Sequence, residues 1–384
     1  MKRPMKYVIV RCEDAAPGGD RVAALLDGSK TAHLHQLAQA GTAGLIRHAA
    51  DHAPVDRLLL RQTLIGLDAQ DPEVAPGRAY AAAANVQFEP GEIAWCCEFV
   101  TQQDGRIIDP AAGRISTKES ELLIHALDER LGAETRRWEI GQGSHHVLIT
   151  RDPALEFERY RAIRSPIAMI NQVWARHLPG GEAGEALRAL LDHAAQTLEG
   201  HPVNRVRVDL GENPANMVWL WGSAQAGSSR TFTERTGLSG AVTSNSFFMR
   251  GLSKSLGLKW AEGPASFEEP ALRRWLKTAA SLVETQELVY IHLQIETADP
   301  VERLCAMERI DQLLLKPLTE RLPTLGSWRL LSAIDDRKNG VVPFVAIGTG
   351  LPQQPIAQLT SEAFAGSPLQ LESGSRLFEW FTAK

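Results

Sequence analysis

Short, continuous runs of apolar residues alternate along this chain with longer segments whose apolar residues recur at helical spacing. The apolar runs are Tyr7–Val10, Val147–Thr150, Leu288–Leu293, Leu330–Ile334 and Phe344–Ile347. Runs of this kind are typical of strands that are buried on both faces of a parallel sheet. The segments with helical spacing are Leu187–Leu198, Ala271–Val283 and Val301–Leu322. This alternation predicts an α/β fold with a mainly parallel sheet flanked by helices.

The stretch from residue 81 to residue 200 has a different pattern. The elements predicted there are a strand pair around Glu92–Thr101, a helix over Lys118–Leu131 and a strand near Arg136–Ile140. Junctions that contain Pro, Gly or Asn flank the stretch at Ala75–Gly77 and Gly200–Asn204. We therefore expect residues 81–200 to form a smaller α+β domain, inserted into a core domain made of residues 1–80 and 201–384.

The composition is that of an ordinary globular protein with room for two or three domains. The chain has 384 residues, of which 44% are hydrophobic and 23% are charged, and its formal net charge is −5. A negative net charge without a Lys/Arg cluster argues against a nucleic-acid partner. The apolar run near the N-terminus, Tyr7–Val10, is too short for a signal peptide or a membrane span. We expect no membrane partner.

The four cysteines do not follow a metal-binding or disulfide pattern. Cys96 and Cys97 are adjacent, whereas Cys12 and Cys305 are isolated. Such cysteines are typical of reduced thiols in a cytoplasmic protein. Walker A, G-x-G-x-x-G, H-E-x-x-H and G-x-S-x-G motifs are also missing from the sequence.

Several short motifs occur in the same order as in one known enzyme family. The best matching pieces are Gly91–Trp95 leading to Phe99–Thr101, Asp109–Ser116 and Trp219–Gly222, and further matches are Ile65–Asp68 and Ala306–Asp311. In sequence and order they resemble the archaeal-type 2,3-bisphosphoglycerate-independent phosphoglycerate mutases, over nearly the whole chain. The resemblance implies an alkaline-phosphatase-like core with an inserted cap domain. It also implies phosphoryl transfer through a serine nucleophile beside two divalent metal ions, in the cleft between core and cap.

The residues at the start of the family's site are replaced in this chain. The family's first strand ends in an Asp that binds metal, but here Arg11 stands at that position. Glu13 or Asp14 would replace the ligand only if the turn were reshaped. The family's Ser-Asp nucleophile pair aligns with Arg57 and Leu58, so the nucleophile is expected to be lost.

A second metal motif of the family, His-x-Glu-x-x-Asp followed by His, is also largely lost. Gln294 and Arg303 stand at the two His positions, while Asp299 is retained. His292 lies two residues before Gln294 on the same strand face and is a possible replacement. The alternative role for Asp299 is to cap the helix that begins directly after it.

The family's late Asp-His pair matches Asp335 and Asp336, which follow a predicted strand. The carboxyl end of a parallel strand is a common place for functional groups. With Asp299, these carboxylates are candidates for a single Mg²⁺ site. The alternative is an ordinary solvated turn.

On the substrate side, the family holds phosphate and carboxylate with arginines of the cap. Two of those positions align with Cys96 and His145. Arg78, His146 and Asn204 match the family, but packing or turn formation would explain them equally well. His145 and His146 are adjacent on a strand and should face opposite ways, which argues against a joint role.

Our leading hypothesis is a catalytically degenerate homologue that keeps the fold but has lost its catalytic residues, metals and cofactors. Such a protein would act as a binding, structural or regulatory subunit with a protein partner or as a homo-oligomer. If Arg11, Arg57 and Arg303 all point inward, they would also form a basic pocket for an anionic small molecule.

Two alternatives involve catalysis. The first is an active phosphoglycerate mutase, or a related phosphotransferase, that uses Mn, Zn or Mg. Its rebuilt metal site would draw on Glu13, Asp14, His292, Asp299, Asp335 and Asp336. The second is a metal-free enzyme of another class with reactive groups among Cys96, Cys97, His145 and His146.

Overall fold

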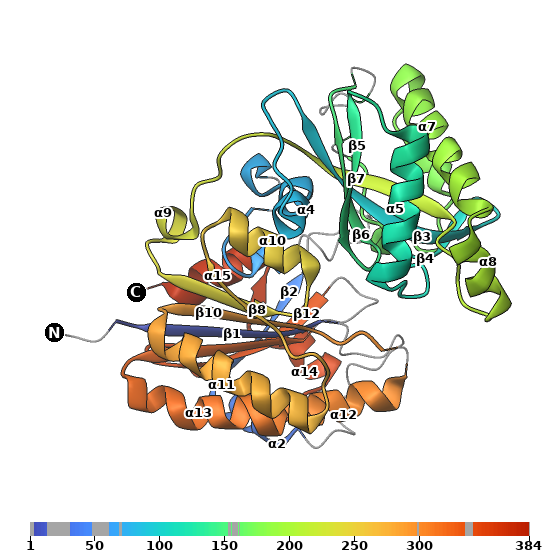
Figure 1. The fold of residues 1–384 in the computed structure, drawn as a ribbon. Helices are drawn as coiled ribbons and strands as arrows, with labels where there is room; N and C mark the ends of the chain where they lie inside the picture. The colour runs from blue at the N-terminus through green and yellow to red at the C-terminus, as the bar shows by residue number, and fades with distance from the viewer. Residues whose placement is uncertain are drawn as a thin grey trace.

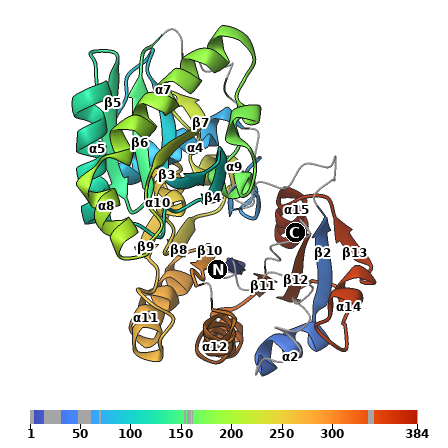
Figure 2. The same cartoon turned by 90° about the vertical axis from the view of Figure 1, so that its right-hand side faces the viewer.

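Two β-sheets organise the molecule, and helices pack against both of them (Figure 1, Figure 2). The computed structural model describes residues 4–13, 31–47, 61–68, 71–152, 155, 160, 162–297, 299–334 and 341–383. Among these residues, no helix is both long enough and apolar enough to span a membrane. All four cysteines are free.

The large sheet has eight strands in the order β13-β2-β12-β11-β1-β10-β8-β9. Their bounds are β1 Lys6–Glu13, β2 Thr42–Arg47, β8 Gly240–Ser244, β9 Lys259–Glu262, β10 Leu288–Gln294, β11 Trp328–Ile334, β12 Val341–Gly348 and β13 Leu369–Leu371. Strand β12 is antiparallel to both of its neighbours, and the other pairings are parallel. The predicted α/β class with a mainly parallel sheet is therefore confirmed.

Helices cover both faces of this sheet because side chains of β1 alternate between them. Val8 and Val10 pack with α2, α11, α12 and α13, whereas Tyr7 and Ile9 pack with α4, α10 and α15. The helix bounds are α2 Ala32–Ala40, α4 Pro76–Ala84, α9 Phe232–Thr236, α10 Phe247–Ser255, α11 Glu269–Thr285, α12 Pro300–Ile310, α13 Lys316–Arg321, α14 Ser361–Ala365 and α15 Gly374–Thr382. The single helix predicted over Val301–Leu322 is formed by α12, a π-helical turn and α13.

The smaller sheet is antiparallel and has five strands. They are β3 Ile93–Gln103, β4 Arg106–Asp109, β5 Arg136–Gln142, β6 His145–Thr150 and β7 Met217–Gln225, with helices α5 Thr117–Leu131, α7 Gly181–Glu199 and α8 Pro202–Asp209. Strand β3 lies between β6 and β7 and carries the sheet's most buried segment.

Three predicted strands need correction. The run Val147–Thr150 belongs to β6 of the smaller antiparallel sheet, because a strand covered on both faces has the same apolar pattern in either kind of sheet. Phe344–Ile347 lies in β12, which is antiparallel. Glu92–Thr101 is the greater part of one long strand, β3, and not a strand pair. The predicted domain bounds remain a prediction, although β7 places residues after 201 in the smaller sheet.

Helices α4 and α10 lie in close contact between the two sheets (Figure 1). Gly251 of α10 makes this possible, because a Cβ atom there would lie 1.7 Å from the carbonyl oxygen of Ala79. Helix α4 also packs on β3 and β7, while α10 packs on β8. The helix pair therefore fixes the smaller sheet beside the carboxyl ends of the large sheet's central strands.

Candidate functional site

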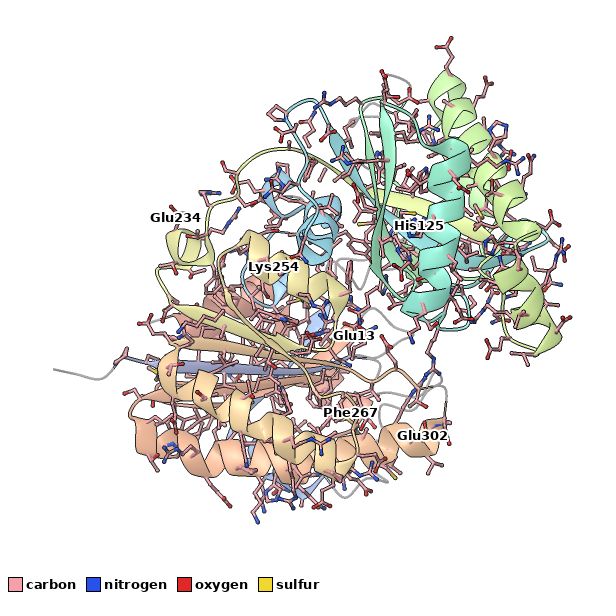
Figure 3. All side chains as sticks on the ribbon, viewed as in Figure 1. Glu13, His125, Glu234, Lys254, Phe267 and Glu302 are labelled. Carbon is pink, nitrogen blue, oxygen red and sulfur yellow. The ribbon has the colours of Figure 1, made fainter. Side chains whose placement is uncertain are left out.

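Three parallel strands of the large sheet end together and bring Glu13, His292 and Ser244 to one edge. Arg11 of β1 is in register with His292 of β10, which is in register with Ser244 of β8. Figure 3 shows Glu13 at the end of the large sheet nearest to the smaller sheet. The carboxyl ends of parallel strands are where α/β proteins usually place functional groups, so this edge is the candidate site.

Glu13 is the centre of a buried ion-pair network. Its Oε1 accepts a hydrogen bond from Arg61 Nη2 at 2.7 Å, and its Oε2 accepts one from Arg61 Nε at 2.8 Å. His292 Nε2 donates to the same Oε2 at 2.8 Å, and Arg11 Nη2 lies 3.7 Å from it. All four side chains are buried. One carboxylate is thus shared by two guanidinium groups and an imidazole.

The hydrogen bonds determine the protonation of His292. Because Nε2 donates to Glu13, Nδ1 accepts a hydrogen bond from Ser244 Oγ at 2.8 Å. Ser244 Oγ in turn accepts from the backbone N–H of Ser246 at 3.0 Å, and Arg61 Nη1 donates to Ser246 Oγ at 3.1 Å. Burial lowers the pKa of His292 to about 4. The imidazole is neutral at pH 7 and forms part of a closed network.

The network carries more positive than negative charge. Burial alone would raise the pKa of Glu13, but the charges of Arg61 and Arg11, with hydrogen bonds from Arg61 and His292, hold that pKa well below its usual range. The charge of Glu13 and its hydrogen bonds outweigh burial and raise the pKa of Arg61. With both arginines charged, Glu13 ionised and His292 neutral, the cluster has a net positive charge.

These residues do not fit a pair of divalent metal ions. Such a centre needs several anionic or imidazole donors around two nearby cations. In the part of the chain that the structure describes, no three His, Cys, Asp or Glu side chains group closely enough to hold a metal. Both oxygens of Glu13 already accept hydrogen bonds, and the adjacent guanidinium groups would repel a cation.

Other predicted metal candidates have different roles or cannot be placed. Asp299 Oδ1 accepts a hydrogen bond from Val301 N at 2.8 Å, so the predicted helix cap is confirmed. Three further candidates lie outside the described residues, namely Asp14, Asp335 and Asp336. Of the predicted set, the structure therefore brings together only Glu13 and His292 among the residues it describes.

Two of the three arginines suggested for a basic pocket contact different groups. Arg11 pairs with Glu13 inside the sheet edge, and Arg303 Nε donates to the Thr297 carbonyl at 2.6 Å. Arg57 lies outside the described residues. Sequence reasoning instead missed Arg61, which lies in the helical segment 61–63. The available signal was a charged residue directly after the apolar run Leu58–Leu60.

A second buried carboxylate, Glu98 of β3, lies under the face of the smaller sheet that meets α4 and α10. Its Oε1 accepts hydrogen bonds from Tyr80 Oη at 2.7 Å and Trp221 Nε1 at 2.8 Å. His145 Nδ1 lies 3.3 Å from its Oε2. Burial, followed by the charge of Glu98, raises the pKa of Tyr80 well above its ordinary value. The tyrosine therefore stays protonated and donates to Glu98.

His145 is the partly exposed member of this second cluster. Its ring stacks on Phe247 of α10, with centroids 5.7 Å apart and planes 13° apart. Nδ1 also lies 3.1 Å from Tyr80 Oη, which already donates its hydrogen bond to Glu98. Nδ1 therefore carries a proton and donates toward Tyr80 and Glu98.

The remaining candidates for reactive groups in the smaller sheet are fully buried. Burial, together with the charge of Glu98, raises the pKa of the Cys97 thiol, and Cys96 is equally enclosed. His146 accepts a hydrogen bond from Gly141 N at 3.0 Å and its Nε2 lies 2.9 Å from the Gly143 carbonyl. Burial lowers the pKa of His146 to about 3. These contacts give His146 a role in the β5–β6 hairpin, and the raised pKa of its thiol makes Cys97 a poor nucleophile.

Arg78 and Asn204, predicted as substrate-binding residues, hold backbone segments. Arg78 donates to the carbonyls of Gln225 at 2.7 Å and Gly227 at 3.0 Å. Asn204 Nδ2 donates to the Ala215 carbonyl at 2.9 Å, and its Oδ1 accepts from Ala215 N at 2.8 Å. These bonds support the packing and turn roles that were the alternatives for both residues.

Comparison with known proteins gives consistent matches. Residues 38–204 match the family model described as 2,3-bisphosphoglycerate-independent phosphoglycerate mutase. An enzyme of that name from Methanosarcina mazei is 28% identical over 306 residues, covering 77% of this chain and 76% of the relative. A probable enzyme of the same name from Geobacter sulfurreducens is 27% identical and covers 92% of this chain and 93% of the relative.

Solved structures show the same fold. A cofactor-independent phosphoglycerate mutase from Thermoplasma acidophilum superposes with a TM-score of 0.56 at 20% identity, covering 99% of this chain and 98% of that one. A protein from Pyrococcus horikoshii gives a TM-score of 0.68 at 15% identity, with 99% and 97% coverage. These similarities confirm that this chain shares its fold with a cofactor-independent phosphoglycerate mutase.

Proposed function

Because this chain is a homologue of the 2,3-bisphosphoglycerate-independent phosphoglycerate mutases, we propose that it keeps their fold without their two-metal phosphotransfer. In this proposal the protein acts by binding, as a structural or regulatory subunit. The observation that carries it is the network in which Arg61, Arg11 and His292 enclose Glu13 at the carboxyl edge of the large sheet.

The network supports the loss of metal chemistry through its charge. The resemblance implies that the two ions of an active family member neutralise phosphoryl oxygens, which requires anionic ligands around them. Here an arginine occupies the position of the first-strand ligand, and a second arginine pairs with the neighbouring carboxylate. The guanidinium groups supply the positive charge at this edge, but Glu13 already neutralises part of it.

The smaller sheet supports the same proposal from the substrate side. Two positions where the family has arginine carry the buried thiol of Cys96 and the imidazole of His145. Beside them lies the buried carboxyl of Glu98, whose hydrogen bonds come from Tyr80 and Trp221. A phosphorylated acid would lose its bidentate clamps and would approach a carboxyl group. We infer that phosphoglycerate is not a ligand of this surface.

The proposal includes a location and a partner class. Free cysteines, three of them buried, suit a protein of the reducing cytoplasm. A protein that acts without catalysis needs a binding partner, so we propose that it works bound to another protein or to copies of itself.

The proposed function is tested by following the interconversion of 2- and 3-phosphoglycerate by ³¹P NMR. The purified full chain is assayed with Mn²⁺, Zn²⁺ and Mg²⁺ in turn, and the Methanosarcina mazei relative serves as the positive control. We expect turnover by the relative and none by this chain under any of the three ions. Metal-dependent turnover by this chain would overturn the proposal and favour a site rebuilt with Asp14, Asp335 and Asp336.

A further inference from the structure

Exposed apolar side chains gather on two neighbouring helices of the smaller sheet. Of the seven large apolar residues that are exposed among the described residues, four lie here, namely Leu122 on α5 and Val206, Val208 and Leu210 on or directly after α8. Leu210 is 70% exposed. Single exposed apolar residues are ordinary, but a group on adjoining helices is a feature of interaction sites.

The inner side of α8 is fixed by buried polar residues, which leaves its outer side open. Arg207 Nη1 donates to Glu119 Oε1 of α5 at 2.9 Å, and its Nη2 donates to the Ala112 carbonyl at 2.9 Å. Val206 and Leu210 are four residues apart and therefore lie one above the other on the outer side. Leu122 lies one turn along α5 from Glu119, the residue that Arg207 contacts.

Charged residues of opposite sign accompany the apolar ones on α8. Arg205 and Asp209 are both exposed, are four residues apart and lie beside Val206 and Leu210. Neither has an ion-pair partner in the part of the chain that the structure describes, even though their spacing would allow them to pair with each other. The outer side of α8 therefore offers one positive and one negative group on the same flank of an apolar strip.

We propose that α8 and the adjoining side of α5 form a two-fold symmetric interface with a second copy of this chain. In such an interface the same patch meets itself, so its charges must be complementary to themselves. An antiparallel pair of α8 helices would place Val206 of each copy against Leu210 of the other. It would also place each Arg205 beside the other copy's Asp209, which satisfies this requirement.

The interface lies apart from the candidate site. Figure 1 shows α8 at the outer edge of the smaller sheet, whereas Glu13 lies at the edge of the large sheet. The dimer therefore does not rest on the proposed loss of phosphotransfer, and it leaves the carboxyl edge of the large sheet uncovered. A monomer would leave another protein as the proposed partner, whereas phosphoglycerate turnover would not bear on the dimer.

The experiment is sedimentation equilibrium on the full chain over a range of concentrations. We expect the unchanged protein to be a dimer, and the double variant V206E/L210E to weaken dimerisation by about 100-fold or more, because charged groups would enter an apolar contact. Val301→Glu is the matched control, since Val301 is 65% exposed but lies on α12, far along the chain from this patch. It should leave the dimer unchanged.

Charge reversal separates the proposed contact from general effects on solubility. Arg205→Asp alone should weaken the dimer, and the double reversal R205D/D209R should restore it, because the reciprocal pairs are re-formed with exchanged signs. Circular dichroism of each variant establishes that it is folded. A monomer at all concentrations would overturn the proposal, as would a dimer that V206E/L210E leaves intact.

Discussion

The two buried carboxylates, Glu13 on the large sheet and Glu98 on the smaller sheet, are stabilised in opposite ways. Glu13 is held by the guanidinium groups of Arg61 and Arg11. Glu98 is held by hydrogen bonds from uncharged donors, Tyr80 and Trp221, with His145 beside it. The difference shows that Glu13 has fixed cationic neighbours, whereas the hydrogen bonds to Glu98 come from uncharged donors.

The two clusters also adjoin each other. The positive charge of Arg61 opposes the rise in the pKa of Tyr80, although burial and Glu98 dominate that pKa. Arg61 bonds to Ser246, and the next residue, Phe247, stacks on His145. A substitution in one cluster should change the free energy of unfolding by a different amount from a substitution in the other. The cause of this difference is electrostatic and not a difference in burial.

Glu13→Gln should have the largest effect. It would leave Arg11 and Arg61 buried without a neutralising charge, which typically costs about 3–5 kcal/mol in the free energy of unfolding. The measurement is urea-induced unfolding. Glu262→Gln is the control, because Glu262 pairs with Arg250 at the surface and should contribute about 1 kcal/mol or less. Equal losses for the two variants would mean that Glu13 does not neutralise the arginines.

The stability of the protein should also fall with decreasing pH through the large-sheet cluster. The pKa of His292 is about 4 in the folded chain and about 6.5 in an unfolded one. Between these values the unfolded chain binds a proton that the folded chain does not. The stability that neutral His292 contributes is therefore fully present above pH 6.5. It is lost as the pH falls toward 4, which lowers the free energy of unfolding by about 3 kcal/mol.

His292→Gln tests this origin of the pH dependence. The free energy of unfolding of the variant should fall less between pH 6.5 and pH 4 than that of the unchanged protein. Part of the decline should remain, because His146 also has a lowered pKa, about 3. Identical pH profiles would show that His292 is not buried in its neutral form.

Glu98→Gln should cost less than Glu13→Gln. The amide oxygen can still accept the hydrogen bonds of Tyr80 and Trp221, and no guanidinium group loses its counter-charge. We expect a loss of about 1–3 kcal/mol from the mismatched hydrogen bond toward His145. Urea unfolding under the same conditions provides the comparison. A larger loss than that of Glu13→Gln would contradict the distinction between the two carboxylates.

Arg114→Ala should have the smallest effect on global stability. Arg114 Nη1 donates to the Glu296 carbonyl at 2.9 Å, from a turn of the smaller sheet to the loop after β10. This exposed bond is worth about 1 kcal/mol or less. Its loss should appear locally, as faster amide hydrogen exchange near Glu296 while exchange in β1 is unchanged. Unchanged exchange near Glu296 would show that the contact does not hold this loop.

Much of the large sheet could be predicted from sequence because its central strands, such as β1 and β10, are continuous apolar runs. The apolar pattern does not reveal strand direction or sheet membership. The sequence alone therefore predicts β12 and β6 as strands of a parallel sheet, although both pair in antiparallel fashion. In the site, the Asp299 cap followed from local sequence alone. The contact between Glu13 and His292 needs the register of β1 and β10, and Arg61 becomes a site residue only through a contact across 48 positions of the chain.

The most direct test of the central claim is the metal content of the purified chain after incubation with Mn²⁺, Zn²⁺ and Mg²⁺ and removal of free ions. If guanidinium groups have replaced the cations at the edge of the large sheet, elemental analysis should find no stoichiometric metal with any of the three. Two equivalents of metal per chain would contradict the account and would favour an active two-metal enzyme.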